Sequence, residues 1–346
     1  MKHIYTSIVI FVATCTSLFS QEKKSPIDDL PDYIKQVTFF GERADWSHDG
    51  ERILFIEKTF GDVFEVEIAT GNIRPMTHHF FHEGFVRALY LSNGDILLSG
   101  AKNFNSDDPW KSRDARNTEL WVLKRDLKSA PTSLGVHCKE GPAVSRTKMN
   151  IAWALGSTIY QGEIAYEEGK PKLKNWKPLF QSSDLPTPAK GWDLETQNFR
   201  PGNESELIFY AFGGNFGFQA EVLGYDIEKK AFVNYSKSES TYDEAEGTFP
   251  NGLSLLVESN RHRTKYKGMK EFLTLDLYKM KLDESGEVER ITYFNDNPEF
   301  KASNGVISDD GKYMAFQYAH AEDPAGKGRG ILILDLKAWE KKKGKR

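Results

Sequence analysis

Cysteine, long apolar runs and an excess of charge of one sign are all scarce in this sequence. Only Cys15 and Cys138 are cysteines among its 346 residues. The 46 basic and 50 acidic side chains give a formal net charge of -4, which offers no broad attraction for nucleic acid or anionic lipid. After Ser20, no apolar stretch reaches the roughly 20 residues that a bilayer-spanning helix needs. We therefore expect no nucleic-acid partner and no membrane span.

Several catalytic motifs are also absent. The sequence has no Gly-rich phosphate loop, no His-Glu-x-x-His pair and no Gly-x-Ser-x-Gly elbow. Nucleotide hydrolysis, zincin proteolysis and α/β-hydrolase chemistry therefore lose their usual sequence support. Amphipathic helical periodicity is missing as well after residue 20, apart from a short segment at residues 338–343. The lack of helical periodicity favours an all-β protein.

The first twenty residues differ from the rest of the chain. A short basic start precedes the apolar run Ile4–Phe19, and Ser20 offers a small residue to signal peptidase. Residues 1–20 are therefore predicted to be a signal peptide, which makes the protein periplasmic or secreted. Lipoprotein processing at Cys15 is the alternative and would give an outer-membrane lipoprotein. After cleavage only Cys138 remains, so we expect no intrachain disulfide and interpret Cys138 as a small buried side chain.

A four-stranded pattern repeats along the chain. Residues 44–56 read as a strand, a tight turn at Asp49-Gly50 and an apolar strand, because an Asp-Gly pair supplies the positive φ that a hairpin turn needs. Residues 63–68 then alternate between apolar and polar, and a last short strand follows the turn at Gly71. Similar patterns recur over residues 86–123, 142–180, 197–235, 242–277 and 306–336.

Six such copies predict a closed ring of sheets. Radial repetition of four-stranded sheets without helices is the way β-propellers protect their sheet edges. The last copy ends after its third strand, whereas residues 34–39 resemble the fourth strand of a blade. We therefore expect an all-β, six-bladed β-propeller of four-stranded antiparallel blades over residues 34–337, closed by the N-terminal strand. Residues 21–33 would be a linker and residues 338–346 a basic tail. A two-sheet sandwich is the structural alternative.

The repeat resembles a known family. Trp46-Ser47-His48-Asp49-Gly50, followed by the apolar Ile53-Leu54-Phe55 and then by Gly71 and Thr77, is similar to the propeller repeat of TolB-like (WD40-like) proteins. The resemblance covers nearly the whole chain after residue 20 and implies a six-bladed propeller. It does not settle the activity, because proteins with such repeats include peptidase accessory domains and oligogalacturonate lyases.

Propeller geometry predicts where a site would lie. The connections between blades, and the loops between the second and third strands of each blade, would share one face of the ring. This loop-rich face would carry most of the unusual polar side chains. The candidate ligand-binding residues on it are His78, His79, His82, Glu83, Arg113, Trp192, Glu195, Glu246, Arg261, His262, Arg263 and His320.

These residue types indicate three kinds of ligand. Neutral imidazoles beside a carboxylate can bind a metal, so His78, His82 and His262 are candidate ligands of a divalent metal, although no cofactor is firmly implied. Guanidinium groups such as those of Arg261 and Arg263 match carboxylates, sulfates or phosphates. Aromatic side chains can stack on sugar rings or peptide side chains, and those on this face are Trp110, Trp192, Phe216 and Phe218.

Two functional hypotheses follow. The first is a non-catalytic propeller that binds a protein partner or an anionic glycan on its loop-rich face. The second is a polysaccharide lyase or related carbohydrate-active enzyme. Its His and Arg side chains would neutralise a uronate carboxylate and remove the neighbouring proton, with or without a metal. Convergence of His78, His82, His262 and His320 would favour the second hypothesis.

Overall fold

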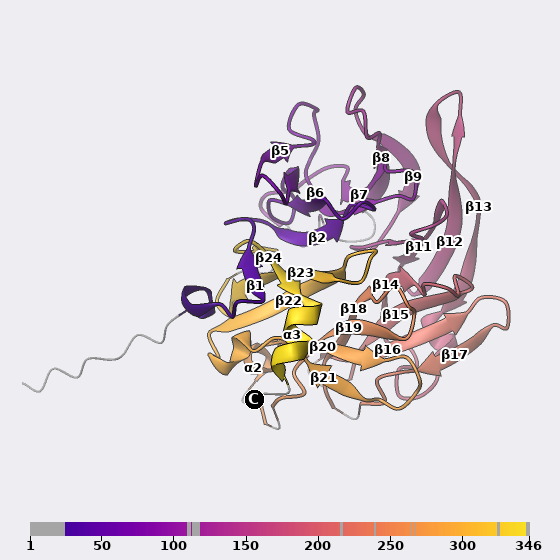
Figure 1. Ribbon diagram of the computed structural model, residues 1–346. Coiled ribbons are helices and arrows are strands. Elements are labelled where there is room, and N and C mark those ends of the chain that lie inside the picture. The colour runs from indigo at the N-terminus through magenta and orange to yellow at the C-terminus, as the bar shows by residue number, and fades with distance from the viewer. Residues whose placement is uncertain are drawn as a thin grey trace, which may run out of the picture.

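The protein is a ring of six four-stranded antiparallel sheets, shown as a computed structural model in Figure 1. The structure describes residues 25–108, 112, 118–214, 217–238, 240–263, 265–266, 268–323 and 326–343, so the predicted signal peptide lies outside the described residues. The predicted six-bladed propeller is confirmed, and the alternative of a two-sheet sandwich is wrong. No helix in the described ranges is long and apolar enough to cross a membrane.

Each blade is numbered here from its innermost strand outward. Blade 1 contains β2 (Glu42–Trp46), β3 (Arg52–Ile56), β4 (Val63–Glu67) and β5 (Ile73–Pro75). Blade 2 contains β6 (Phe85–Tyr90), β7 (Ile96–Ala101), β8 (Thr118–Leu123) and β9 (Thr132–His137). Blade 3 contains β10 (Ala143–Val144), β11 (Asn150–Leu155), β12 (Thr158–Glu167) and β13 (Lys170–Gln181).

The second half of the ring follows the same order. Blade 4 contains β14 (Asp193–Phe199), β15 (Glu206–Gly213), β16 (Gln219–Asp226) and β17 (Ala231–Asn234). Blade 5 contains β18 (Asp243–Thr248), β19 (Ser254–Ser259), β20 (Asp276–Lys281) and β21 (Val288–Arg290). Blade 6 contains β22 (Phe300–Ile307), β23 (Tyr313–His320), β24 (Ile331–Asp335) and β1 (Ile34–Gln36). The described short helices are η1 (Pro26–Asp29), η2 (Ser182–Asp184), α2 (Met269–Phe272), η4 (Phe294–Asp296) and α3 (Leu336–Lys343).

The N-terminal strand closes the ring, as predicted. β1 pairs antiparallel with β24, with Ile34 opposite Leu334 and Gln36 opposite Leu332. The last blade is therefore built from both ends of the propeller. The C-terminal segment adds to this closure, because Trp339 of α3 is 3% exposed and packs in the core between blades 5 and 6.

The hydrophobic core is divided among the six seams between neighbouring blades. Successive residues of a strand point to opposite faces of its sheet, so each blade contributes to two seams. In β3, Leu54 packs with side chains of blade 2, whereas Phe55 packs with side chains of blade 6. Trp46 is 1% exposed in the second of these cores. Alternate side chains of a strand therefore pack into the two seams on either side of its blade, which explains the alternation seen in the sequence.

The innermost strands are interrupted by β-bulges. The register shifts in β2, β6, β14, β18 and β22, and in each case the inner strand has one residue more than its neighbour. A bulge bends its strand and turns a side chain in a new direction. The extra residues lie around Arg43, Val86, Gln197, Glu246 and Asn304, next to the axis of the ring.

One strand differs from the prediction. The repeat copy over residues 242–277 places its third strand at residues 272–277, but Phe272 ends α2 and the strand β20 starts at Asp276. The reason is packing, because Phe272 is fully buried between the rings of Tyr242 and Tyr266. The Phe272 side chain therefore packs in the core between blades 4 and 5 and does not belong to a strand.

Cys138 is a free, buried thiol, as interpreted from the sequence. Burial raises its pKa to about 12. A thiol attacks as the thiolate, so Cys138, which stays protonated near neutral pH, is a poor nucleophile in the folded protein.

His48 ties four blades together on the face that carries the Asp-Gly turns. Its Nε2 lies 3.0 Å from the carbonyl oxygen of Leu91, which can only accept, and its Nδ1 lies 2.8 Å from Asp309 Oδ2. Asp309 also accepts a hydrogen bond from Arg146 Nε at 2.9 Å. The bond to Asp309 raises the pKa of His48 above its ordinary value. The imidazolium form therefore donates two hydrogen bonds here.

We expect the substitution His48→Gln to destabilise the protein mainly at low pH. A raised pKa means that the stabilisation is complete below the ordinary histidine pKa and is lost as the pH rises through the raised value. Urea unfolding should show a loss of about 1 kcal/mol near pH 5.5 and a smaller loss near pH 8.5. Equal losses at both pH values would contradict a charged His48.

Candidate functional site

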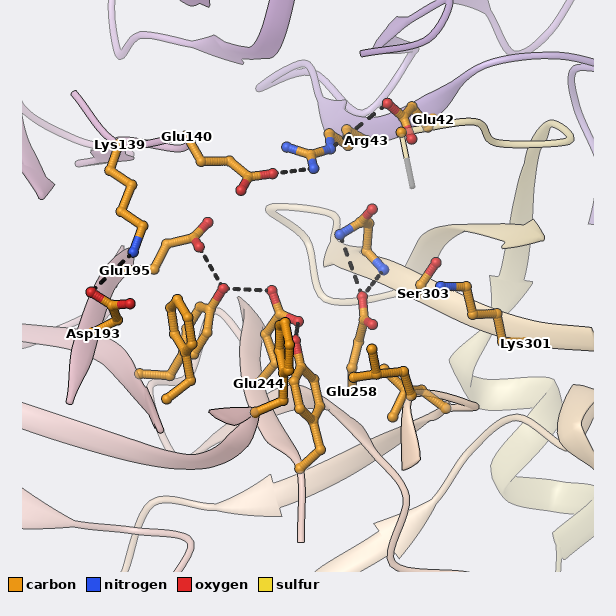
Figure 2. Close-up of a pocket in the computed structure, with 18 of the residues that line it drawn as sticks. Glu42, Arg43, Lys139, Glu140, Asp193, Glu195, Glu244, Glu258, Lys301 and Ser303 are labelled. Atoms are coloured by element: carbon orange, nitrogen blue, oxygen red, sulfur yellow. Dashed lines mark hydrogen bonds and ion pairs between the residues drawn. The ribbon is translucent and has the colours of Figure 1, made fainter. Parts of the chain in front are cut away.

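A funnel opens on the axis of the ring at the loop-rich face. It is a cavity of about 840 Å³, and the side chains around it come from all parts of the ring. Figure 2 shows Glu195, Glu244 and Glu258 on one wall, with Arg43 and Glu140 across the cavity. The lining also includes Glu42, Lys139, Asp193, Tyr210, Phe212, Phe218, Tyr242, Lys301, Ser303, Asn304 and Gln317.

The funnel continues into the centre of the ring. Asn304 lines both the funnel and a narrow central cavity of about 50 Å³. Asp45 and Arg146 line both this central cavity and a third cavity, of about 530 Å³, at the opposite face. The axis is therefore constricted at its centre and wide at both ends.

The bulges of the inner strands determine which side chains reach the axis. Arg43 and Asn304 have left-handed backbones, with φ of 57° and 48°. Gly247 follows the bulge residue Glu246, and a Cβ added to Gly247 would lie 2.7 Å from the Cα of Val306. Glycine therefore lets two inner strands approach closely while Glu246 turns toward the axis.

Two tyrosines and two glutamates form a hydrogen-bonded chain in the funnel wall. The Tyr210 hydroxyl lies 2.6 Å from Glu195 Oε2 and 2.8 Å from Glu244 Oε1. The hydroxyl of Tyr242 donates to Glu244 Oε2. One phenol has a single proton, so Tyr210 can donate to only one of its two carboxyl neighbours. The other contact needs a protonated carboxyl group.

Glu244 is the group that holds this proton. Burial, with further contributions from the nearby Glu258 and Glu195, raises the pKa of Glu244 to about 8. The pKa of Glu195 is also raised, chiefly by burial, but Arg87 Nη2 lies 3.9 Å from its Oε1 and favours the charged form. Near neutral pH, Glu244 therefore donates to Tyr210, and Tyr210 donates to Glu195.

Glu246 and Glu258 lie deeper and share Asn304. The backbone N–H of Asn304 donates to Glu258 Oε1 at 2.5 Å, and its side-chain amide donates to Glu246 Oε1 at 3.2 Å. Burial and the proximity of Glu258 raise the pKa of Glu246 well above its usual range. In the described part of the chain, Glu244, Glu246 and Glu258 are the one group of possible metal ligands whose donor atoms lie within 4.8 Å of one another. Such oxygen ligands can share protons or hold a hard cation.

Arg43 provides the main positive charge opposite these carboxyl groups. Its guanidinium group pairs with Glu140, and its Nη1 donates to the carbonyl oxygen of Val86 at 3.1 Å. The backbone N–H of Arg43 donates to Gln317 Oε1 at 2.6 Å. Arg43 is therefore held by blades 2 and 6 and is already matched by an acidic partner.

The structure does not bring the three predicted metal-binding histidines together. His82 Nδ1 accepts from the N–H of Gly84 at 3.0 Å, and its Nε2 donates to Asp62 Oδ1 at 3.0 Å. In blade 5, His262 Nδ1 lies 3.0 Å from the Tyr278 hydroxyl and its Nε2 lies 2.7 Å from Asn295 Oδ1. Both nitrogens of each ring are engaged within the protein, and burial lowers the pKa of His262. Neither ring has a nitrogen available for a metal.

The other predicted histidines also make local contacts. The rings of His78 and His79 meet edge to face with centroids 5.3 Å apart, and His79 Nε2 lies 3.3 Å from the carbonyl oxygen of Leu127. His320 Nδ1 accepts from the N–H of Glu322 at 3.2 Å. Glu83 is half-buried in the segment between β5 and β6. None of these four residues lines a described cavity.

The predicted arginines form internal contacts. Arg261 binds the buried Asp243 with Nε and Nη2, at 3.0 Å and 2.8 Å. Arg263 donates from Nε and Nη2 to Asn295 Oδ1, at 3.0 Å and 2.8 Å. Trp192 packs over Gly213, where an added Cβ would lie 2.6 Å from the indole. Arg113, Trp110 and Phe216 lie outside the described residues.

Two of the predicted ligand-binding residues do reach the axis, namely Glu195 in the funnel and Glu246 in the central cavity. Phe218, predicted as a stacking residue, lines the funnel beside Phe212, and their ring centroids are 6.3 Å apart. Sequence reasoning missed Glu42, Arg43, Glu140, Tyr210, Tyr242, Glu244, Glu258 and Asn304. A usable signal was present in Glu246-Gly247 and Asn304-Gly305, because glycine inside a strand often marks a bulge.

Comparison of the sequence with known proteins identifies no relative. No family model matches the chain, and no curated protein matches it. Fold comparison is more informative, because many solved structures resemble this one.

Three of these structures illustrate the likeness. Hydrazine synthase from Kuenenia stuttgartiensis is 12% identical, over 82% of this chain and 75% of that chain, with a TM-score of 0.50. TolB from Acinetobacter baumannii is 13% identical, over 88% of this chain and 65% of that chain, with a TM-score of 0.46. Oligogalacturonate lyase from Vibrio parahaemolyticus is 9% identical, over 87% of this chain and 80% of that chain, with a TM-score of 0.49. At these identities the likeness is one of fold.

Proposed function

We propose that this protein is a non-catalytic binding propeller whose funnel accepts a basic segment of a protein partner. The observation that carries the proposal is the charge of the funnel. Six acidic side chains line it, and with Glu244 mostly protonated near neutral pH, five of them remain to face three basic ones, Arg43, Lys139 and Lys301. Two of the three are already paired, Arg43 with Glu140 and Lys139 with Asp193. The cavity therefore favours a ligand that brings a Lys or Arg side chain or a free amino terminus.

The aromatic lining supports a cationic ligand. Tyr210, Phe212, Phe218 and Tyr242 border the cavity beside the carboxyl groups. A cation over an aromatic face is attracted by the ring, and carboxylates nearby add to this attraction. The funnel wall already contains one example, because Lys139 Nζ lies 4.6 Å from the centre of the Phe212 ring.

A protein partner fits these side chains better than an anionic glycan does. A uronate polymer would bring its carboxylates toward Glu195, Glu244 and Glu258. The arginines that were expected to receive such groups, Arg261 and Arg263, are bound to Asp243 and Asn295. The scattered histidines likewise give the lyase hypothesis no support. With the predicted signal peptide at residues 1–20, the partner would be a periplasmic or secreted protein.

The proposal can be tested with labelled peptides. Fluorescence anisotropy would compare a lysine octapeptide with a glutamate octapeptide. We expect the first to bind and the second not to bind, with an affinity that falls as salt rises. The substitution Glu258→Gln removes a buried carboxylate from the funnel and should weaken binding of the lysine peptide by roughly tenfold or more.

Glu244→Gln provides a matched control. Glu244 is mostly protonated near neutral pH, so an amide in its place changes the shape little and the charge hardly at all. This variant should bind the lysine peptide like the original protein at pH 7. Equal binding of both peptides, or no effect of Glu258→Gln, would exclude a cation-selective funnel.

A further inference from the structure

A fourth cavity, also charged, lies between blades 1 and 2 on the face opposite the funnel. It has a volume of about 440 Å³ and is bordered by the turns that follow β2 and β6. Its charged lining consists of His48, Asp49, Arg52, Glu65, Arg74 and Arg125. We refer to this cavity as the arginine cleft.

Both carboxylates of the arginine cleft are saturated by neighbours. Arg74 Nε donates to Glu65 Oε1 at 2.9 Å, and the Tyr90 hydroxyl donates to Glu65 Oε2 at 2.5 Å. Asp49 Oδ2 accepts from Arg52 Nη2 at 2.7 Å, and Asp49 Oδ1 accepts from the Ser47 hydroxyl at 2.5 Å. His48 is paired with Asp309 outside the cleft, so the rest of the lining has three guanidinium groups and two carboxylates. The cleft is therefore positive in a chain of net negative charge.

Several guanidinium N–H groups of the cleft have no protein acceptor. Arg52 Nε is buried and has no hydrogen-bond partner. Among the described residues, no carboxylate pairs with Arg125, whose one side-chain bond goes from Nη1 to the carbonyl oxygen of Asn93 at 3.3 Å. A buried donor without an acceptor is costly, and guanidinium groups match the oxygens of phosphate and sulfate.

We propose that the arginine cleft binds a compact oxyanion, a phosphate or sulfate group. The group would be held between Arg52 and Arg74 of blade 1 and Arg125 of blade 2. This site is independent of the funnel, because the two cavities share no lining residue. An oxyanion there would also join two neighbouring blades on the turn face.

Isothermal titration calorimetry with inorganic phosphate and with inorganic sulfate, at constant ionic strength, tests the proposal. We expect saturable binding of one anion per chain. The exposed Arg125 can be replaced without disturbing the core, and Arg125→Ala should weaken binding by about tenfold. Lys128→Ala is the matched control, because it removes an exposed positive charge from the same β8–β9 turn without touching the cleft. It should leave the affinity unchanged.

Phosphoserine distinguishes a free anion from a phosphate group carried by a larger molecule. Tighter binding of phosphoserine than of inorganic phosphate would support a carried group, and equal binding would support the free anion. Absence of saturable binding of all three probes would overturn the proposal. Equal weakening by Arg125→Ala and Lys128→Ala would overturn it as well, because the effect would then be one of general surface charge.

Discussion

Replacing Ile34 by Asp will destabilise the protein by about 3 to 5 kcal/mol, because it buries an unpaired charge at the point where the ring closes. Ile34 is 7% exposed and packs in the core between blades 5 and 6. Its strand β1 has a single sheet neighbour, β24, and pairs with it over three residues. Backbone bonds from Val37 and Thr38 to Ile331 continue this pairing, so the closure depends on one short stretch of chain whose apolar side chain at position 34 is buried.

Lys35→Asp is the control for this prediction. It places the same carboxylate on the same strand, but Lys35 is exposed and points to the other face of the sheet. Urea unfolding followed by tryptophan fluorescence should show a small loss of stability, within about 0.5 kcal/mol, for this variant. If Ile34→Asp lost as little stability as Lys35→Asp, β1 would not be part of the cooperative fold.

The architecture could be predicted because it depends on local signals. Asp-Gly pairs mark hairpin turns, and alternation in segments such as residues 63–68 marks strands that face two seams. The closure by β1 was also visible, since the last copy of the repeat lacked its fourth strand. The start of β20 was not, because Phe272 is apolar both in a strand and in the buried helix end that it forms.

The site was harder to predict because it depends on where side chains point at the axis. His82 and His262 attracted attention as clustered polar residues in loops, but each satisfies its hydrogen bonds within its own part of the ring. Glu244, Glu246 and Asn304 lie inside strands, where alternation assigns side chains to one face or the other. A bulge of one residue changes that assignment, and its position follows from contacts between strands that the sequence does not display.

The original protein should lose stability as the pH rises above about 5. The substitution Glu244→Gln should remove most of this loss. The folded protein keeps the proton of Glu244 up to a pKa of about 8, whereas an unfolded chain releases it near the ordinary value of 4.5. Between these values unfolding releases a proton, so the free energy of unfolding falls with rising pH. Glutamine has no such proton, accepts from Tyr242 and donates to Tyr210 as the protonated carboxyl does.

Urea unfolding at several pH values measures this effect. The variant and the original protein should be about equally stable near pH 5, and the variant should be more stable by roughly 2 to 4 kcal/mol near pH 9. Glu51→Gln is the control, because it removes an exposed carboxyl group on the turn face and should leave the pH dependence unchanged. A variant that loses stability at every pH would mean that Glu244 is ionised in the fold and that Tyr210 donates to it. The sign of the stability change at high pH therefore shows whether Glu244 is protonated or ionised in the folded protein.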